Sequence, residues 1–161
     1  MNQLQSLISE TAKSTLLLRS FGLAKVPLLF ATSPKVTDIT DASCSIEMPF
    51  RKIIKNHLGS VYFGALAIGA DCCIGFLAVH KINKSKKKVN LVFKSFKANF
   101  LKRAEGHITF RCEEGALIQE MLDETLASGE RVNKVISAFA LVNGEVVAEF
   151  ELELSLKYKT N

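Results

Sequence analysis

The chain has 161 residues, 48% of them hydrophobic, and its 21 Lys and Arg against 16 Asp and Glu give a formal charge of +5. This apolar content excludes intrinsic disorder, and the 9 Gly and 3 Pro exclude a collagen-like or low-complexity chain. The length predicts a single domain, residues 1–161, that is large enough to bury a core of its own.

The four cysteines, Cys44, Cys72, Cys73 and Cys112, show no CxxC pair and no Cys/His spacing typical of a metal site. We expect them to be small buried hydrophobic residues that stay reduced. The N-terminus MNQLQSLISE lacks the basic start and apolar core of a signal peptide. Together these features indicate a cytoplasmic protein.

The segment from Val61 to Val79 is nineteen residues long and carries one charge, Asp71. Its length would suit a membrane span. A charge in the middle of a span is unfavourable, however, and the rest of the chain has the amphipathic pattern of an α+β domain. A helix that is apolar on all sides also suits a core enclosed by a sheet. We therefore expect a central core helix and no membrane span.

The chain before this segment predicts a helix, a connector and a strand. Residues 3–19, part of a helical extension over about 1–20, have helical spacing, and one face carries Leu4, Leu7, Ile8, Thr11, Thr15 and Leu18. Residues 21–30 form an apolar connector, and a strand is expected over 36–48.

The polar loop 51–60 ends at Ser60, a good N-cap for a central helix that continues to about Lys81. Residues 89–101 alternate as a strand does, but the apolar phase slips near Lys94-Ser95. The slip indicates a bulge or burial on both faces of the strand.

The next elements are a strand over 107–112 and a short helix over 115–128. Glu113 and Glu114 favour the positive N-terminal end of that helix, and Gly129 is a typical helix stop.

The last two strands are joined by Asn143-Gly144, a strong signal for a two-residue type I′ hairpin turn. The turn pairs Leu141 with Val146, and the same register pairs Phe139 with Ala148. One face of the predicted hairpin is then apolar and carries Val135, Phe139, Leu141, Val146, Ala148, Phe150 and Leu152. The other face carries Glu149, Glu151 and Glu153.

An antiparallel sheet with one apolar face needs a cover, and the only segment apolar enough is 61–79. The expected fold is therefore α+β: a hotdog fold, in which an antiparallel sheet wraps around a long central helix, with an extra N-terminal helix.

The run NHLGSVYFGALAIGAD at 56–71 resembles the loop and helix start of hotdog thioesterases of the phenylacetyl-CoA type. That family carries an Asn-containing loop, then His-Gly-Gly, then seven residues to an Asp. Here Tyr62-Phe63-Gly64 stands in the His-Gly-Gly place, and Asp71 lies seven residues after Gly64. Residues 98–112 are also similar, and the resemblance, to a bacterial branch of unknown function, covers about residues 20–158.

Seven residues turn a helix through about 700°, so Gly64 and Asp71 lie on one face. The N–H of Gly64, in the first turn, can face an oxyanion, and the absence of a Cβ lets a thioester carbonyl approach closely. Asp71 can attack that carbonyl or activate a water. Burial among apolar residues should raise the pKa of Asp71.

A structural interpretation of the same residues stays open. Asp71 could be a buried hydrogen-bonded residue at a dimer seam, and Gly64, Gly69 and Gly75 could serve close helix packing. Acyl-thioester dehydratases of the same fold use a His and an acidic residue at the separation of His57 and Asp71. Asn56 is a candidate for orienting a water or binding a substrate amide.

The run from Lys81 to Lys88 holds five lysines and no acid. Its lysines could simply be solvated at a helix C-terminus. The functional alternative is a clamp for the phosphates of coenzyme A, formed by Lys84, Lys86, Lys87 and Lys88. The run is short and lacks interleaved aromatic residues, so nucleic acid is not an expected partner.

The resemblance implies an acyl thioester hydrolase acting on acyl-CoA or an acyl carrier. It implies a homodimer, or a dimer of dimers, with Asp71 from one chain and the Gly64 region of the other forming the pocket. No metal or tightly bound cofactor is needed, since coenzyme A is part of the substrate. The alternatives are a non-catalytic acyl- or lipid-binding dimer and a dehydratase or hydratase that uses His57.

Overall fold

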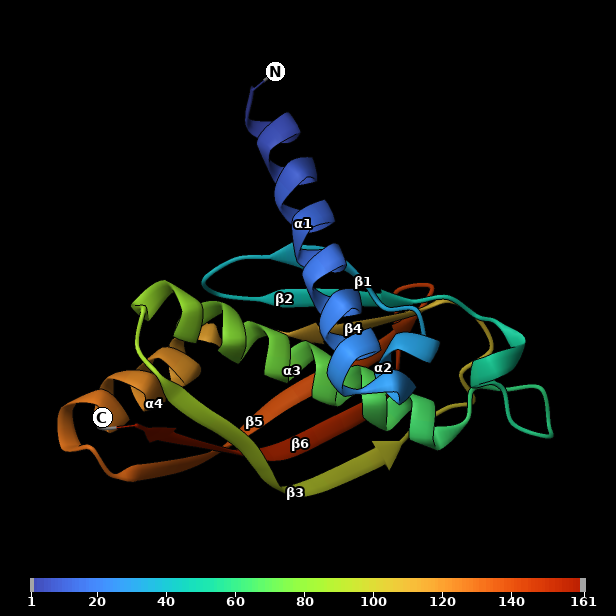
Figure 1. The fold of residues 1–161 in the computed structure, drawn as a ribbon. Coiled ribbons are helices and arrows are strands. Elements are labelled where there is room, and N and C mark those ends of the chain that lie inside the picture. The colour runs from blue at the N-terminus through green and yellow to red at the C-terminus, as the bar shows by residue number, and fades with distance from the viewer. Residues whose placement is uncertain (1, 160–161) are drawn as a thin grey trace.

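A six-stranded sheet forms the frame of the protein (Figure 1), and the computed structural model describes residues 2–159, with the backbone alone for 2–9. The sheet order is β1-β2-β4-β5-β6-β3, and every neighbouring pair is antiparallel. The strands are β1 (Lys35–Ile39), β2 (Cys44–Met48), β3 (Val89–Phe100), β4 (Ile108–Cys112), β5 (Arg131–Val142) and β6 (Glu145–Tyr158).

Helix α3 (Phe63–Ser85) runs along one face of this sheet and contacts β2, β3, β4 and β5 (Figure 1). Its apolar positions join the inward-facing residues of the strands in one core. At Gly69 the ring of Phe110 packs so closely that a Cβ would overlap it, so this glycine sets the helix–sheet distance. The predicted α+β hotdog arrangement is confirmed.

Three further helices complete the fold: α1 (Asn2–Lys25), α2 (Pro27–Ala31) and α4 (Gly115–Ser128), with a 3-10 turn, η1, at Lys52–Ile54. Helix α4 packs on α3, β5 and β6, and α1 packs on α2 and β1. The predicted helix over 115–128 and its stop at Gly129, with φ +68°, are confirmed.

Among the described helices, α3 alone has the length and hydropathy of a membrane span, but it packs here as the core helix. All four cysteines are buried, as expected, and the Cys73 thiol donates to the carbonyl of Cys44 at 3.2 Å.

The N-terminal region differs from its prediction in length. The first helix continues to Lys25, through part of the expected connector, and the rest of that connector forms α2. Leu18 on the predicted inner face is buried, and the Thr15 hydroxyl accepts from the Val36 N–H at 3.0 Å. The side chains of Leu4, Leu7 and Ile8 lie outside the described residues.

The predicted strand 36–48 is wrong as one element, because it is a hairpin of β1 and β2. The Thr40 hydroxyl accepts hydrogen bonds from the backbone N–H groups of Ala42 and Ser43, which closes the turn. The polar residues of this turn do not break the strand pattern of the sequence enough to show that two strands are present.

The ends of α3 also differ from the prediction. Tyr62, not Ser60, precedes the first helical residue, and the Ser60 hydroxyl instead bonds Asn56. The helix continues past Lys81 to Ser85 and ends at Lys86, which takes the left-handed conformation at φ +57°.

The hairpin turn is confirmed, with positive φ at Asn143 and Gly144 and Leu141 opposite Val146. The register beyond it is wrong, because the register shifts and Ala140 pairs with Ala148, which leaves Val147 without a partner on β5. The carbonyl of Val147 accepts from the N–H groups of Leu101 and Lys102, which holds the extra residue in place.

The shift reverses the faces of β5. Val135 and Phe139 are 52% and 37% exposed on the outer face, opposite Glu153 and Glu149, while the core residues of β5 are Val132, Ile136, Ala138 and Ala140. The predicted core face of β6, with Ala148, Phe150 and Leu152, is confirmed. The predicted bulge of the strand after α3 is also confirmed, since the register shifts between Phe93 and Ser95.

Candidate functional site

A cavity of about 440 Å³ opens between α3 and the last strand of the sheet, β3. Its lining is mostly apolar and consists of Ala67, Ile68, Asp71, Phe93, Lys94, Ser95, Phe96 and Leu152. The β3 bulge lies within this lining, because the register shifts between Phe93 and Ser95. An apolar cavity with a single acidic group has the character of a ligand site.

Asp71 is that acidic group. Burial of the carboxyl among apolar neighbours raises its pKa, although the residue as a whole is exposed at the mouth of the cavity. With the described side chains, those of residues 10–159, it forms no hydrogen bond or ion pair, so a hydrogen-bonded structural role is not supported within this part of one chain. An unpaired carboxyl with a raised pKa in a cavity is a candidate for chemistry.

Gly64 is the second residue of α3, where backbone N–H groups have no acceptor within the helix. The ring of Tyr62 lies over it, so closely that a Cβ on Gly64 would overlap the ring. Tyr62 also contacts Phe63, with ring centres 4.8 Å apart, and Phe63 lies 6.4 Å from Phe100. These three rings are 48%, 59% and 52% exposed and form an apolar surface at the start of α3.

Gly64 and Asp71 share a helix face, but seven residues separate them by about 10 Å along the axis. A reacting carbonyl must lie about 3 Å from both the oxyanion donor and the attacking group. One chain therefore does not bring its own Gly64 N–H and Asp71 carboxyl to the same atom.

Asn56 has its side chain engaged in the loop before α3. Its Oδ1 accepts from the N–H of Leu58 at 2.9 Å, and its Nδ2 donates to the hydroxyl of Ser60 at 3.0 Å. His57 is exposed in the same turn, and neither residue lines the Asp71 cavity. The structure thus gives Asn56 a part in shaping the loop and does not bring His57 to Asp71.

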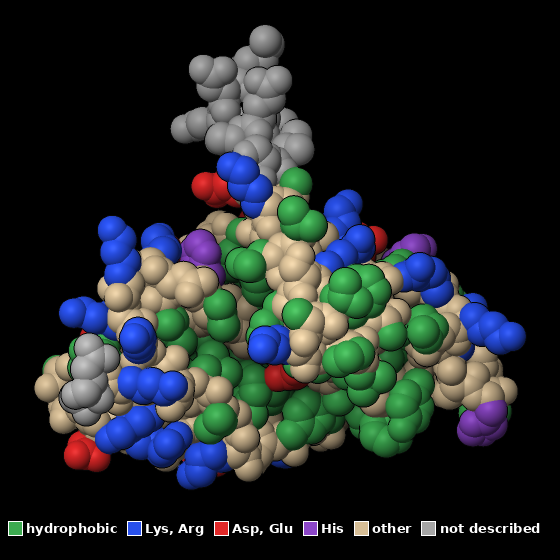
Figure 2. All heavy atoms as spheres, viewed as in Figure 1, with side chains coloured by type: hydrophobic (Ala, Val, Ile, Leu, Met, Phe, Trp, Pro, Cys, Tyr) green, Lys and Arg blue, Asp and Glu red, His purple; other side chains and the backbone are tan. Residues whose placement is uncertain are grey.

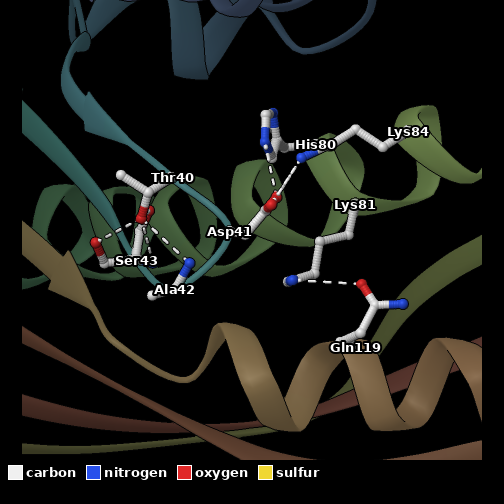
Figure 3. A network of polar contacts seen from close by, with 8 residues as sticks. All are labelled: Thr40, Asp41, Ala42, Ser43, His80, Lys81, Lys84 and Gln119. Atoms are coloured by element: carbon white, nitrogen blue, oxygen red, sulfur yellow. Dashed lines mark hydrogen bonds and ion pairs between the residues drawn. The ribbon is translucent and has the colours of Figure 1, made fainter.

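The lysines lie at the opposite end of α3. Lys84 binds both carboxylate oxygens of Asp41, at 2.6 and 2.8 Å, and His80 lies 3.6 Å from the same carboxylate (Figure 3). Lys84 is thirteen residues, or about 20 Å of helix, from Asp71. Lys86, Lys87 and Lys88 follow as exposed residues.

Lys81 differs from the other lysines of the run, because it is only 5% exposed. Its Nζ donates to the side-chain oxygen of Gln119 on α4 at 3.4 Å (Figure 3). This hydrogen bond joins α3 to α4. No group of three or more His, Cys, Asp or Glu suited to a metal ion occurs in the part of the chain that the structure describes.

Sequence reasoning found Asp71 but missed the β3 side of the cavity, above all Phe93 and Phe96. The signal was present in the phase slip at Lys94-Ser95, because bulges often lie beside functional sites. The slip by itself predicts only a bulge or burial on both faces, because the sequence does not show which helix lies against that strand.

A hotdog sheet around a central helix, with an acidic group in a cavity beside the edge strand, defines the class of this protein. Residues 15–156 match the family described as a domain of unknown function, DUF4442, and the chain belongs to that family. No curated protein matches the sequence.

Solved structures share the fold. A Pseudomonas aeruginosa protein of unknown function, described as a probable thioesterase, superposes with a TM-score of 0.76 at 22% identity and covers 90% of this chain and 96% of its own. A protein of unknown function from Chlorobaculum tepidum gives 0.79 at 11% identity, covering 92% and 97%. A thioesterase family protein from Silicibacter pomeroyi gives 0.63 at 18% identity, covering 92% and 99%.

Proposed function

We propose that this protein hydrolyses an acyl thioester, of coenzyme A or of an acyl carrier, in a pocket shared by two copies of the chain. The observation that carries the proposal is the unpaired Asp71 carboxyl in an apolar cavity at the open edge of the sheet. The description of several fold neighbours as thioesterases, and the likeness of residues 56–71 to the phenylacetyl-CoA type, support the same reaction.

A second copy of the chain would supply the Gly64 N–H that one chain cannot bring to the same atom as its own Asp71 carboxyl. Strand β3 pairs with β6 on one side only, so its other edge offers unpaired backbone groups. Phe96 and Phe100, 45% and 52% exposed, lie along this strand beside the cavity. Pairing two β3 edges would cover these rings and could set the Gly64 of one chain against the Asp71 of the other.

In this site the Asp71 carboxylate takes a proton from water, and the water oxygen adds to the thioester carbonyl. The N–H of Gly64, at the positive end of α3, binds the oxygen that becomes negative. The carbon–sulfur bond then breaks, and the proton held by Asp71 passes to the leaving thiolate. Direct attack by Asp71, through an anhydride that water hydrolyses, uses the same two groups.

The apolar side chains of the cavity, Ile68, Phe93, Phe96 and Leu152, suit an acyl group. Lys86, Lys87 and Lys88 are candidates for the phosphates of coenzyme A. Lys84 contributes less, because its charge is already paired with Asp41.

The second candidate is an acyl-binding dimer without turnover. The position of the Tyr62 ring favours it, because the ring fills the side of Gly64 where a Cβ would stand and so removes the space that the glycine would leave for a carbonyl.

A screen for free thiol release across acyl-CoA esters tests the proposal, with the wild type, Asp71→Asn and the remote control Asp123→Asn assayed together. Thiol release that Asp71→Asn abolishes and Asp123→Asn leaves unchanged supports hydrolysis. If the wild type binds acyl-CoA but releases no thiol, the result supports the acyl-binding function instead of hydrolysis.

A further inference from the structure

Helix α1 and the short helix α2 carry large apolar side chains that are exposed on the folded chain. Leu16, Leu17, Phe21, Leu23 and Leu28 are between 53% and 69% exposed. In Figure 2 hydrophobic side chains gather over the lower part of α1 and over α2, with Lys and Arg side chains around them. We call these five residues the α1–α2 surface.

The attachment of α1 to the body uses other residues of the helix, although Leu17 also lines a cavity with Phe76 and Val79 of α3. Leu18 is 4% exposed, Gly22 is buried against α2, and Thr15 bonds the backbone of Val36. Arg19 donates to the carbonyl of Pro34 at 3.0 Å. Leu16 and Leu23 share a direction, because seven residues return a helix to within about 20°. That direction lies about 200° from the buried Leu18, since Leu16 is two residues from it, so both side chains project away from these contacts. The attachment of α1 therefore does not depend on the side chains of Leu16 and Leu23.

The α1–α2 surface is also separate from the candidate site. Helix α1 packs on β1, which is the sheet edge opposite to β3. Helix α1 therefore does not pack on the β3 edge that we propose for pairing two chains. Several large apolar side chains exposed on neighbouring helices mark a site of interaction with a partner.

The charges beside the surface indicate what that partner is. From Thr11 to Thr37 the chain has no acidic residue, and Lys13, Lys25 and Lys35 are exposed. A twofold contact between two such faces would set lysines against the same lysines with no acid to pair them. Anionic lipid headgroups complement the lysines, and the acyl region beneath them accepts leucine and phenylalanine side chains.

We propose that the α1–α2 surface binds the face of an anionic membrane, with α1 lying along the interface and the core helix remaining inside the fold. Leucine and phenylalanine side chains insert at the boundary of the headgroups, while Lys13 and Lys25 contact the phosphates. The protein then lies on the membrane without crossing it.

The test is co-sedimentation of the full chain with phosphatidylcholine vesicles, with and without phosphatidylglycerol. We expect binding to the anionic vesicles alone, weakened by salt. Leu16→Gln with Leu23→Gln should lower binding at least about tenfold. Lys13→Gln with Lys25→Gln should lower it about fivefold for each lysine, the equivalent of about 1 kcal/mol per basic residue at an anionic surface.

The matched control is Val135→Gln with Phe139→Gln, two exposed apolar residues on the outer face of the sheet, which should bind as the wild type does. Circular dichroism checks that each variant is folded, and the lysine variant keeps the test valid should the leucine variant unfold. The proposal is overturned if the wild type does not sediment with anionic vesicles, or if the control weakens binding as much as the leucine variant. It is equally overturned if the leucine variant changes only the mass in light scattering, because the surface would then join copies of the chain.

Discussion

The aromatic ring of Tyr62 covers Gly64, the residue whose N–H stands at the start of α3. This relationship places an aromatic side chain where the resembling family has histidine, directly over the glycine for which we propose the oxyanion role. Tyr62 is 48% exposed and contacts only the ring of Phe63 among the aromatic pairs that the described residues form. Its ring is therefore free of a packing role in the core and can move when a substrate binds.

Replacing Tyr62 and Gly64, separately and together, distinguishes a ring that merely covers Gly64 from a direct role of Gly64 in the reaction. Gly64→Ala should lower turnover by about 10²–10³, the effect of losing one oxyanion donor, because the methyl group forces the ring aside and occupies the carbonyl approach. Tyr62→Ala alone should keep or raise thiol release. Restoration of activity in the double variant would show that the clash with Tyr62, not the loss of the N–H contact, is the cause.

Asp71→Asn should lower turnover by about 10²–10⁴ while substrate binding is largely kept, because the amide cannot accept the proton from water. The variant should fold as well as the wild type or better, since the amide carries no charge into the apolar cavity. Thiol release and thermal unfolding measured on the same samples check both parts. A folded variant with wild-type turnover would remove Asp71 from the mechanism.

The pH dependence follows from the raised pKa of Asp71, which burial causes. Activity requires the carboxylate, so kcat/KM should rise with pH through a pKa above 3.8, the ordinary value of an aspartate. Stability should change in the opposite direction. The folded state holds the proton over the range between 3.8 and the raised pKa, so its stability falls as pH rises through that range. The free energy of unfolding of the wild type should fall with pH across this range, while that of Asp71→Asn should not. Curves of the two proteins that run parallel across the range would contradict the prediction.

The lysine clamp is tested by Lys86→Gln, Lys87→Gln and Lys88→Gln in one variant. Binding of coenzyme A esters should weaken, and the effect should shrink with salt, because exposed charges are screened over about 8–10 Å at physiological strength. Thioesters that lack the nucleotide should bind unchanged. Lys84→Gln should have a smaller effect, since its charge is paired with Asp41. Equal affinity of the triple variant and the wild type at low salt would leave the run as a solvated loop.

Assembly through β3 predicts a dimer in light scattering, twice the 17.7 kDa of one chain. Phe100→Glu, on β3, should shift the equilibrium toward the monomer, because a carboxylate would be buried in the interface. Val135→Glu is the matched control, since both side chains are 52% exposed but Val135 lies on β5, away from the open edge. A wild-type protein that is only monomeric at micromolar concentration would exclude the shared pocket.

Local signals in the sequence determined the parts of the fold that depend on neighbouring residues. The Asn143-Gly144 turn, the helix stop at Gly129 and the slip at Lys94-Ser95 were predicted, because turn chemistry and periodicity act over a few residues. The apolar content of 61–79 also identified the core helix, since no other segment could cover the sheet. The position of Asp71 on that helix followed from its spacing and from the family resemblance.

Contacts between distant segments decided the rest. The register of β5 on β6 depends on Val147, whose carbonyl accepts from Leu101 and Lys102, about 45 residues earlier in the chain, and no local pattern reports that bond. The sequence makes Asn56 a candidate for catalysis, but in the folded chain its side chain forms hydrogen bonds with Leu58 and Ser60 of its own loop. Burial raises the pKa of Asp71, and only the packing of β3 against α3 brings Phe93 and Phe96 into the same cavity as this residue. Sequence thus specified which residues could act, while the long-range packing of strand on helix decided which of them lie together.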